Sequence, residues 1–298
     1  MAPEGDLKVL LEKPEVKVPW HKALMTNARK HPLGAFGAGI VIAMIFMAGF
    51  ADLVTAFDPE LNSFEDMLTP PSDPFYLGTD QFGRDVLTRI IYGARTALFV
   101  GLTAAFFGSV IGLVLGVASA YFGGRFDLIL QRVMDVFMAF PLIIMALAIV
   151  ATLGPGTENV IIAITIPFIP QCARVVRSNA LAIREIPYVD AARALGFGHA
   201  RIILRHMVPN VMAPFLIMAS TFVGHAILLE ASLSYLGLGV QEPTPAWGLM
   251  LQGGAEEYAE SAPWMAIWPG VAISLAVFGF NLFGDALRDV LDPKLRTR

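Results

Sequence analysis

Between two apolar stretches the chain reads Pro187-Tyr188-Val189-Asp190-Ala191-Ala192-Arg193-Ala194-Leu195-Gly196. Pro187 is typical of the first turn of a helix, where its missing N–H costs nothing. Gly196 is typical of the residue just past a helix, because glycine adopts the left-handed conformation at little cost. Three of the residues between them are alanines, and small side chains let another protein's surface come close to the backbone. We therefore predict a short docking helix over residues 187–196.

The segments around this helix are apolar enough to cross a membrane. The chain is 56% hydrophobic and only 15% charged, which is too apolar for an ordinary soluble domain. Runs without Lys, Arg, Asp or Glu predict membrane-spanning helices. There are six such runs: Leu33–Ala51, Thr96–Gly124, Val136–Thr157, Asn159–Ala173, Met207–Leu229 and Ser261–Gly284. We therefore predict an all-α membrane protein with six transmembrane helices, the fourth being the shortest.

The distribution of positive charge predicts the orientation. Lysines and arginines are enriched in cytoplasmic loops. Of the 21 Lys and Arg residues, all but Arg84, Arg89 and Arg95 fall on one side if both termini are cytoplasmic. The sequence therefore predicts cytoplasmic termini, and it puts the docking helix in the cytoplasm.

The second predicted span carries small residues at every fourth position from Ala104 to Gly124. Such a stripe lets two helices approach closely in lipid. We therefore expect Gly108, Gly112 and Gly116 to face a neighbouring helix. A helix of the same chain is favoured over a helix of a second protein.

Prolines and polar residues inside the spans suggest a pathway for a substrate. Pro141 should kink the third span, and Pro167 and Pro170 the fourth, because proline cannot donate a backbone hydrogen bond. Irregular backbone at membrane depth is tolerated where protein covers it or where it lines a cavity. Packing alone is the alternative explanation. The candidate pathway residues are Pro141, Gln171, His225 and Asn281, while Glu230 is expected at the wet outer boundary.

The outer segment 80–93 has helical spacing at Phe82, Val86, Ile90 and Gly93. It predicts an amphipathic helix at the outer interface. Its polar residues Asp80, Arg84 and Asp85 are candidates for contact with an outer partner. A helix that only caps the bundle is the alternative.

The chain lacks the motifs of a hydrolase. No lysine follows a glycine, so there is no phosphate-binding loop. Cys172 is the only cysteine, the histidines are dispersed, and no residues have metal-ligand spacing. We predict no catalytic residue, no metal and no nucleic-acid partner. A membrane protein with a docking helix but no nucleotide site must take its energy from a partner.

The pattern Asp190-Ala191-Ala192-x3-Gly196-x12-Pro209 resembles the cytoplasmic coupling loop of ABC importer permeases. The family pattern has Glu first, Ile three residues before the proline and Leu just before it, whereas this chain has Asp190, His206 and Val208. Four further stretches resemble the second permease subunit of dipeptide, oligopeptide and nickel importers: Leu77–Asp85, Tyr121–Gly124, Leu236–Gly239 and Asn281–Asp285.

This resemblance implies a type I ABC importer permease (MetI-like) core in the inner membrane. The implied segments are a cytoplasmic tail 1–32, a first helix 33–56, an outer loop 57–93, a five-helix permease core 94–288 with the coupling loop 178–208, and a tail 289–298. The implied ATPase-coupling residues are Pro187, Tyr188, Asp190, Ala191, Ala192, Ala194, Leu195 and Gly196.

The resemblance also implies partners. They are a second homologous permease, two ATPase subunits that use ATP and Mg, an extracytoplasmic binding protein and membrane lipid; this chain itself would bind no cofactor. The implied cargo is di- or oligopeptides, with nickel or another small solute as the alternative. An ion-gradient secondary transporter is less favoured, because the charge-free runs offer only His225 as an ionisable group within one span.

Overall fold

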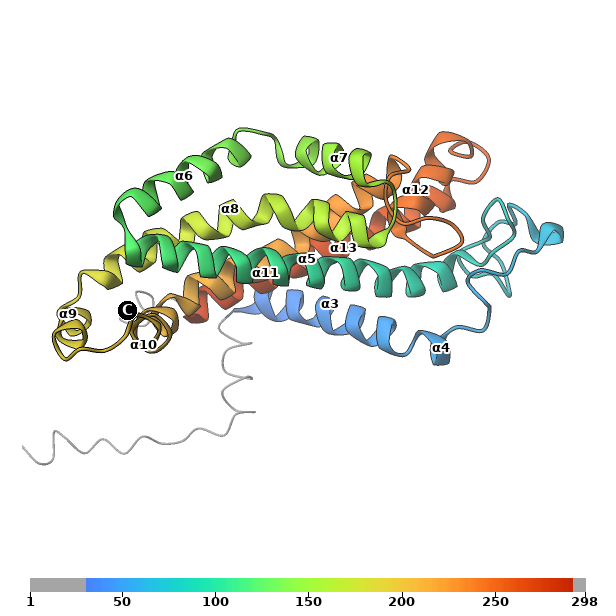
Figure 1. Ribbon diagram of the computed structural model, residues 1–298. Coiled ribbons are helices and arrows are strands. Elements are labelled where there is room, and N and C mark those ends of the chain that lie inside the picture. The colour runs from blue at the N-terminus through green and yellow to red at the C-terminus, as the bar shows by residue number, and fades with distance from the viewer. Residues whose placement is uncertain (1–30, 292–298) are drawn as a thin grey trace, which may run out of the picture.

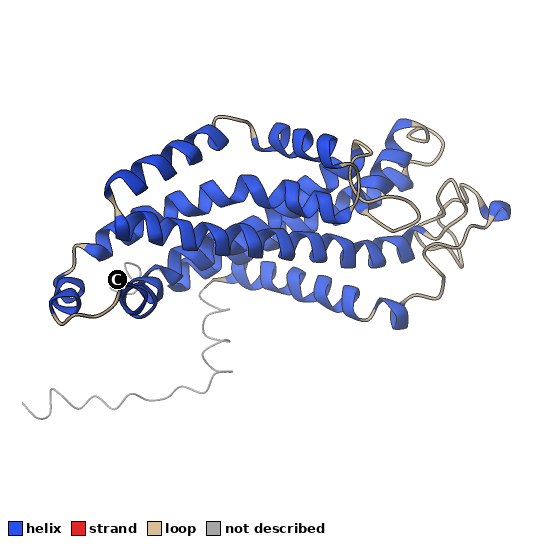
Figure 2. Cartoon of the chain, in the orientation of Figure 1, coloured by secondary structure: helices blue, strands red, loops and turns tan. Residues whose placement is uncertain are grey.

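The computed structural model describes residues 31–291, which fold into a bundle of long helices (Figures 1 and 2). Most of the two predicted tails lies outside these residues. The helices are α3 (Pro32–Gly49), α4 (Ala51–Val54), α5 (Val86–Phe122), α6 (Gly124–Met138), α7 (Leu142–Leu153), α8 (Thr157–Arg184), α9 (Pro187–Ala194), α10 (His199–Ile202), α11 (Val208–Tyr235), α12 (Trp247–Glu256) and α13 (Trp264–Leu291), with a short 3-10 turn at Phe64–Asp66 and a π-helical turn at Ile203–Met207.

Within the described residues, five helical segments are long and apolar enough to cross a membrane, or six if the bent pair α6–α7 counts as one span. The all-α prediction is confirmed. Figure 1 shows α9 and α10 at one end of the bundle, while α12 and the loop between α4 and α5 lie at the opposite end. We call these the α9 end and the α12 end.

The third predicted span, 136–157, is not one helix. The chain bends by 88° between α6 and α7, and Pro141 is the residue just before α7. Pro141 cannot donate a backbone hydrogen bond, and its ring crowds the preceding turn. Where the sequence predicts a kink, the helix therefore breaks into two. Gly154 then ends α7 with a φ of 92°.

The fourth span is longer than the apolar run predicted. Helix α8 extends over 28 residues and contains Pro167 and Pro170 without interruption. Its charged continuation is paired with α6: Arg177 lies 2.5 Å from Asp127, and Arg174 lies 2.5 Å from Asp135. The helix thus continues past the charge-free run that ends at Ala173, and both arginines have carboxylate partners in the same chain.

The core forms where α5 packs along α8. A Cβ built on Gly108 would lie 2.7 Å from the Cβ of Phe168, and one built on Gly116 would lie 2.5 Å from the carbonyl oxygen of Ala173. The glycine stripe thus faces α8 of the same chain. The ring of the same Phe168 also stacks on Phe222 of α11 at 4.2 Å between centroids.

The helix predicted from residue 80 begins later. The Asp80 carboxylate accepts hydrogen bonds from the N–H groups of Phe82 and Arg84, which fixes a turn. Asp85 then caps α5 by accepting from the N–H of Thr88 at 2.8 Å, and α5 continues for 37 residues. The separate interfacial helix is therefore wrong; its second half is the first part of the second span.

Candidate functional site

Helix α9 has the ends that the sequence predicts. Pro187 lies in its first turn. At its other end, the N–H of Phe197 donates to the carbonyl of Ala192 at 3.1 Å, and that of Gly196 to the carbonyl of Arg193 at 2.9 Å. These two hydrogen bonds form the Schellman motif, which ends a helix at a residue in the left-handed conformation. Gly196 is that residue, with a φ of 76°.

The two faces of α9 differ. Val189 and Ala192, three residues apart, are buried against the rest of the chain. Asp190, Ala191 and Ala194 are exposed, and Leu195 is 74% exposed. The prediction that all three alanines form one docking face is therefore wrong for Ala192, because it lies on the opposite side of the helix beside Val189. Within this chain, the open face consists of Asp190, Ala191, Ala194 and Leu195.

Helix α9 is bound to the start of α11. The hydroxyl of Tyr188 donates to the carbonyl oxygen of His206 at 3.1 Å. The side-chain amide of Asn210 donates to the same carbonyl at 2.7 Å and to the Tyr188 hydroxyl at 3.1 Å. The His206 ring lies 5.8 Å from that of Tyr188 and stacks 6.3 Å from that of Phe197. His206, which departs from the family pattern, is thus packed against the rings of Tyr188 and Phe197.

A second set of contacts binds the loop to α5. The Tyr121 hydroxyl lies 2.7 Å from Nδ1 of His199, and the guanidinium of Arg193 lies 5.5 Å from the centre of the Tyr121 ring. Arg184 donates to the carbonyl of Ala120 at 2.8 Å. The segment between α8 and α11 is therefore held by two helices, α5 and α11.

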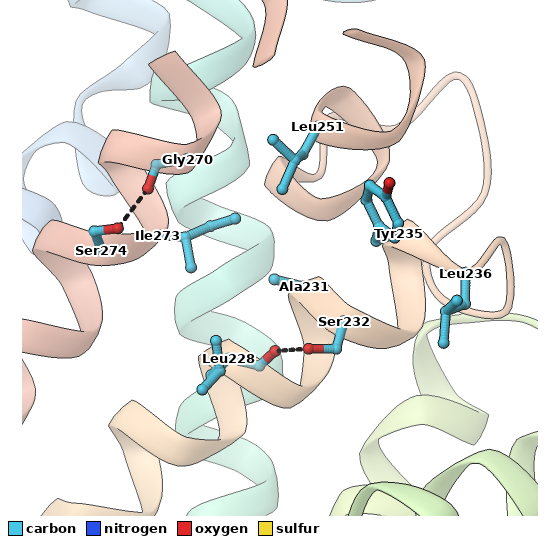
Figure 3. Close-up of a pocket in the computed structure, with 9 residues that line it drawn as sticks. All are labelled: Leu228, Ala231, Ser232, Tyr235, Leu236, Leu251, Gly270, Ile273 and Ser274. Atoms are coloured by element: carbon cyan, nitrogen blue, oxygen red, sulfur yellow. Dashed lines mark hydrogen bonds between the residues drawn. The ribbon is translucent and has the colours of Figure 1, made fainter. Parts of the chain in front are cut away.

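Toward the α12 end, α11 borders a cavity of about 460 Å³ that it shares with α12 and α13 (Figure 3). The serine hydroxyls there donate to their own helices, Ser232 to Leu228 and Ser274 to Gly270, each at 2.8 Å. The wall is otherwise apolar apart from the hydroxyl of Tyr235. The lining residues are Leu228, Ala231, Ser232, Tyr235, Leu236, Leu251, Gly270, Ile273 and Ser274. Sequence reasoning missed this cavity, although serines and a tyrosine near the ends of apolar runs were a usable signal.

The structure separates the predicted pathway residues. His225 is exposed on α11, three residues before Leu228 and so on the face that lines the cavity. Asn281 is half-buried on α13; its Oδ1 would lie 3.2 Å from a Cβ on Gly224. Gln171 lies on α8, and Pro141 lies at the break between α6 and α7. No hydrogen bond among residues 31–291 joins these four side chains.

Glu230 is not at a wet boundary. It is only 1% exposed, and its Oε1 accepts a hydrogen bond from the hydroxyl of Ser234 at 2.7 Å. The same hydroxyl accepts from the N–H of Val240 at 3.2 Å. The expectation was wrong: Glu230 is buried, and the segment after α11 folds back onto Ser234, the residue that donates to the Glu230 carboxyl group.

At the α12 end, a buried ionic network joins two distant loops. Nε of Arg84 lies 2.7 Å from Asp80, and its NH1 lies 2.7 Å from Glu242. Burial acts to lower the pKa of Arg84, but hydrogen bonds to Glu242 and the charge of Asp80 outweigh it, so the pKa is raised. Arg89 donates to the carbonyl of Pro59 at 2.8 Å. Asp80, Arg84 and Asp85 are all buried, so these predicted outer-docking side chains bind within the chain and form no open surface.

Comparison with known proteins gives consistent similarities. Residues 108–297 match the family described as binding-protein-dependent transport system inner membrane component. Residues 19–71 match the N-terminal TM domain of oligopeptide transport permease C.

Named relatives cover nearly the whole chain. The dipeptide transport system permease protein DppC of Alkalihalophilus pseudofirmus is 42% identical over 279 residues, which is 94% of this chain and 91% of the relative. A putative peptide transport system permease protein of Brucella suis is 44% identical and covers 92% of each chain. The glutathione transport system permease protein GsiD of Shigella flexneri is 41% identical, covering 96% of this chain and 94% of the relative.

A solved structure has the same fold. A chain of the inward-facing MetNI methionine ABC transporter matches with a TM-score of 0.56 at 19% identity, covering 69% of this chain and 97% of that chain. At this identity the match bears on the fold alone.

Proposed function

This chain belongs to the family of binding-protein-dependent transport system inner membrane components, and we propose that it forms one half of the pathway of an ATP-driven peptide importer. It is a multi-pass protein of the inner membrane. Its relatives named for dipeptide, peptide and glutathione transport support small peptides as cargo. Nickel and other small solutes are less favoured, because none of these three names refers to them.

The observation that carries the proposal is the open face of α9. Asp190, Ala191, Ala194 and Leu195 are exposed on a helix that begins at Pro187, ends before the left-handed Gly196 and contacts both α11 and α5. A small-residue face on a rigid helix suits insertion into a groove of another protein. We assign that groove to an ATPase subunit, which supplies the ATP and Mg chemistry. This chain would contribute no catalytic group and bind no cofactor.

We also propose that both termini and α9 are cytoplasmic. Six crossings, with α6 and α7 together making one, return the chain to its starting side. The positive charges of the loops at the α9 end support that side being the cytoplasm. The α12 end would then face the extracytoplasmic binding protein.

The second permease would cover the exposed face of α11. His225, Ser232 and Tyr235 lie at helical spacing on this face, and polar groups on a membrane span are disfavoured against lipid. Peptide would pass along this face between the two permeases. Closure of the ATPases would shift the bundle between inward- and outward-open states, which is a population shift between two packed arrangements.

The test is uptake of a radiolabelled dipeptide by proteoliposomes that contain this chain, its second permease, the ATPase subunits and the binding protein. We expect uptake to require ATP and the binding protein and to persist when an ionophore collapses all ion gradients. Uptake that an ion gradient drives without ATP would instead identify a secondary transporter.

A further inference from the structure

We propose that the joint formed by Tyr188, His206 and Asn210 transmits the movement of α9 to α11, so that ATP hydrolysis is coupled to the pathway through this joint. The inference rests on the proposed function. It goes further by assigning a positioning role to two side chains, Tyr188 and Asn210, and to one backbone carbonyl.

The non-helical residues between α9 and α11 are 195–198, which include Gly196 and Gly198. From His199 the helix is continuous through the π-helical turn Ile203–Met207 into α11. A π-helical turn is rare and is often found at a functional site. Pro209 follows it and has no N–H with which to extend the bonding pattern backward. A movement of α9 would therefore be absorbed at residues 195–198 unless other contacts bridge them.

The joint is that bridge. Tyr188 is in the first turn of α9, and Asn210 is in the first turn of α11. The Tyr188 hydroxyl uses both of its capacities here: it donates to the His206 carbonyl at 3.1 Å and accepts from the Asn210 amide at 3.1 Å. The Asn210 amide also donates to that carbonyl at 2.7 Å. The three groups form a closed triangle that connects the two helices across 22 residues of sequence.

The aromatic contacts keep the triangle in register. The His206 ring contacts the ring of Tyr188, in the first turn of α9, and that of Phe197, three residues after the end of α9. Any rotation of α9 relative to the π turn must disturb this stack or break the triangle. Because α11 also lines the cavity shared with α12 and α13, a displacement that enters at Tyr188 reaches the pathway face along one continuous helix.

The experiment measures the ratio of dipeptide transported to ATP hydrolysed in the reconstituted complex. Tyr188→Phe removes the hydroxyl but keeps the ring, and Asn210→Ala removes the amide. The matched control is Asn179→Ala, because the Asn179 amide makes the same kind of bond to the carbonyl four residues earlier, at 2.9 Å, without joining two helices.

Each joint variant is expected to lower the ratio about tenfold, since a tenfold change corresponds to about 1.4 kcal/mol and each loses two hydrogen bonds. The double variant should be no worse than either single variant, because both act through one triangle. The control should match the unmodified complex. Co-purification of the ATPases should be retained in both joint variants.

A wild-type ratio in both joint variants would overturn the proposal while leaving the importer function intact. Loss of ATPase subunits from both variants would also overturn it, because the joint would then serve assembly and not transmission. Absence of ATP-driven uptake in the unmodified complex would contradict the proposed function itself, so the two failures are distinguishable.

Discussion

Gly112 of α5 lies directly against Cys172 of α8: a Cβ on the glycine would stand 2.5 Å from the Cβ of the cysteine. Two non-bonded Cβ atoms do not come that close, so the contact exists only because residue 112 has no side chain. It holds the two helices together at the centre of the bundle.

Gly112→Leu should therefore force α5 away from α8. Overpacking a filled core costs about 1–3 kcal/mol or more, and the loss should appear as a lower thermal midpoint in detergent. Val114→Leu is the matched control, since it adds bulk on the exposed side of the same helix. Equal midpoints for both variants would show that the stripe faces lipid.

Arg84 binds two loops that are far apart in the sequence, through Asp80 and Glu242. Arg84→Gln should destabilise the protein, because removing one partner of a buried pair costs about 3–5 kcal/mol when both charges are buried. Glu242 is 40% exposed at its side chain, so we expect the lower end of that range. Thermal unfolding measures the loss.

The matched control for this network is Arg132→Gln. Arg132 pairs with Asp135 at 3.7 Å, but its side chain is 78% exposed, so little should change. If Arg84→Gln and Arg132→Gln unfold at the same temperature, the buried network makes no net contribution to the stability of the protein.

Cysteine labelling tests the orientation. Cys172 is fully buried and should give no background. In intact cells, a membrane-impermeant maleimide should label Asn62→Cys, whereas Arg201→Cys should react only after the membrane is opened; both positions are exposed. The reverse pattern would contradict the cytoplasmic assignment of α9.

The features that sequence alone predicted are local. The bounds of α9 follow from Pro187 and Gly196, because a missing N–H and a positive φ are properties of single residues. The glycine stripe predicted a close contact but not the identity of the facing residue, Cys172.

The features that sequence missed depend on distant partners. Arg84, predicted to contact an outer partner, instead binds the carboxylate of Glu242, 158 residues away in the same chain. Glu230 is buried, and its partner Ser234 is contacted by Val240 of the segment that folds back after α11. The 88° bend at Pro141 has a local cause, but a proline alone does not determine the size of a bend.

The central claim is that the open face of α9 docks an ATPase subunit, and the Ala191→Arg variant tests it most directly. The bulky charge would be trapped in the docking contact, and an unpaired buried charge costs several kcal/mol. Two matched variants accompany it: Ala182→Arg on the exposed surface of α8, and Ala192→Arg on the buried side of α9.

The measurement is the amount of ATPase that co-purifies with the membrane-inserted permease pair. We predict that Ala191→Arg loses the ATPase while the permease pair stays folded, that Ala182→Arg retains it, and that Ala192→Arg lowers the stability of the permease itself. Full retention of the ATPase by Ala191→Arg, with uptake intact, would contradict the account.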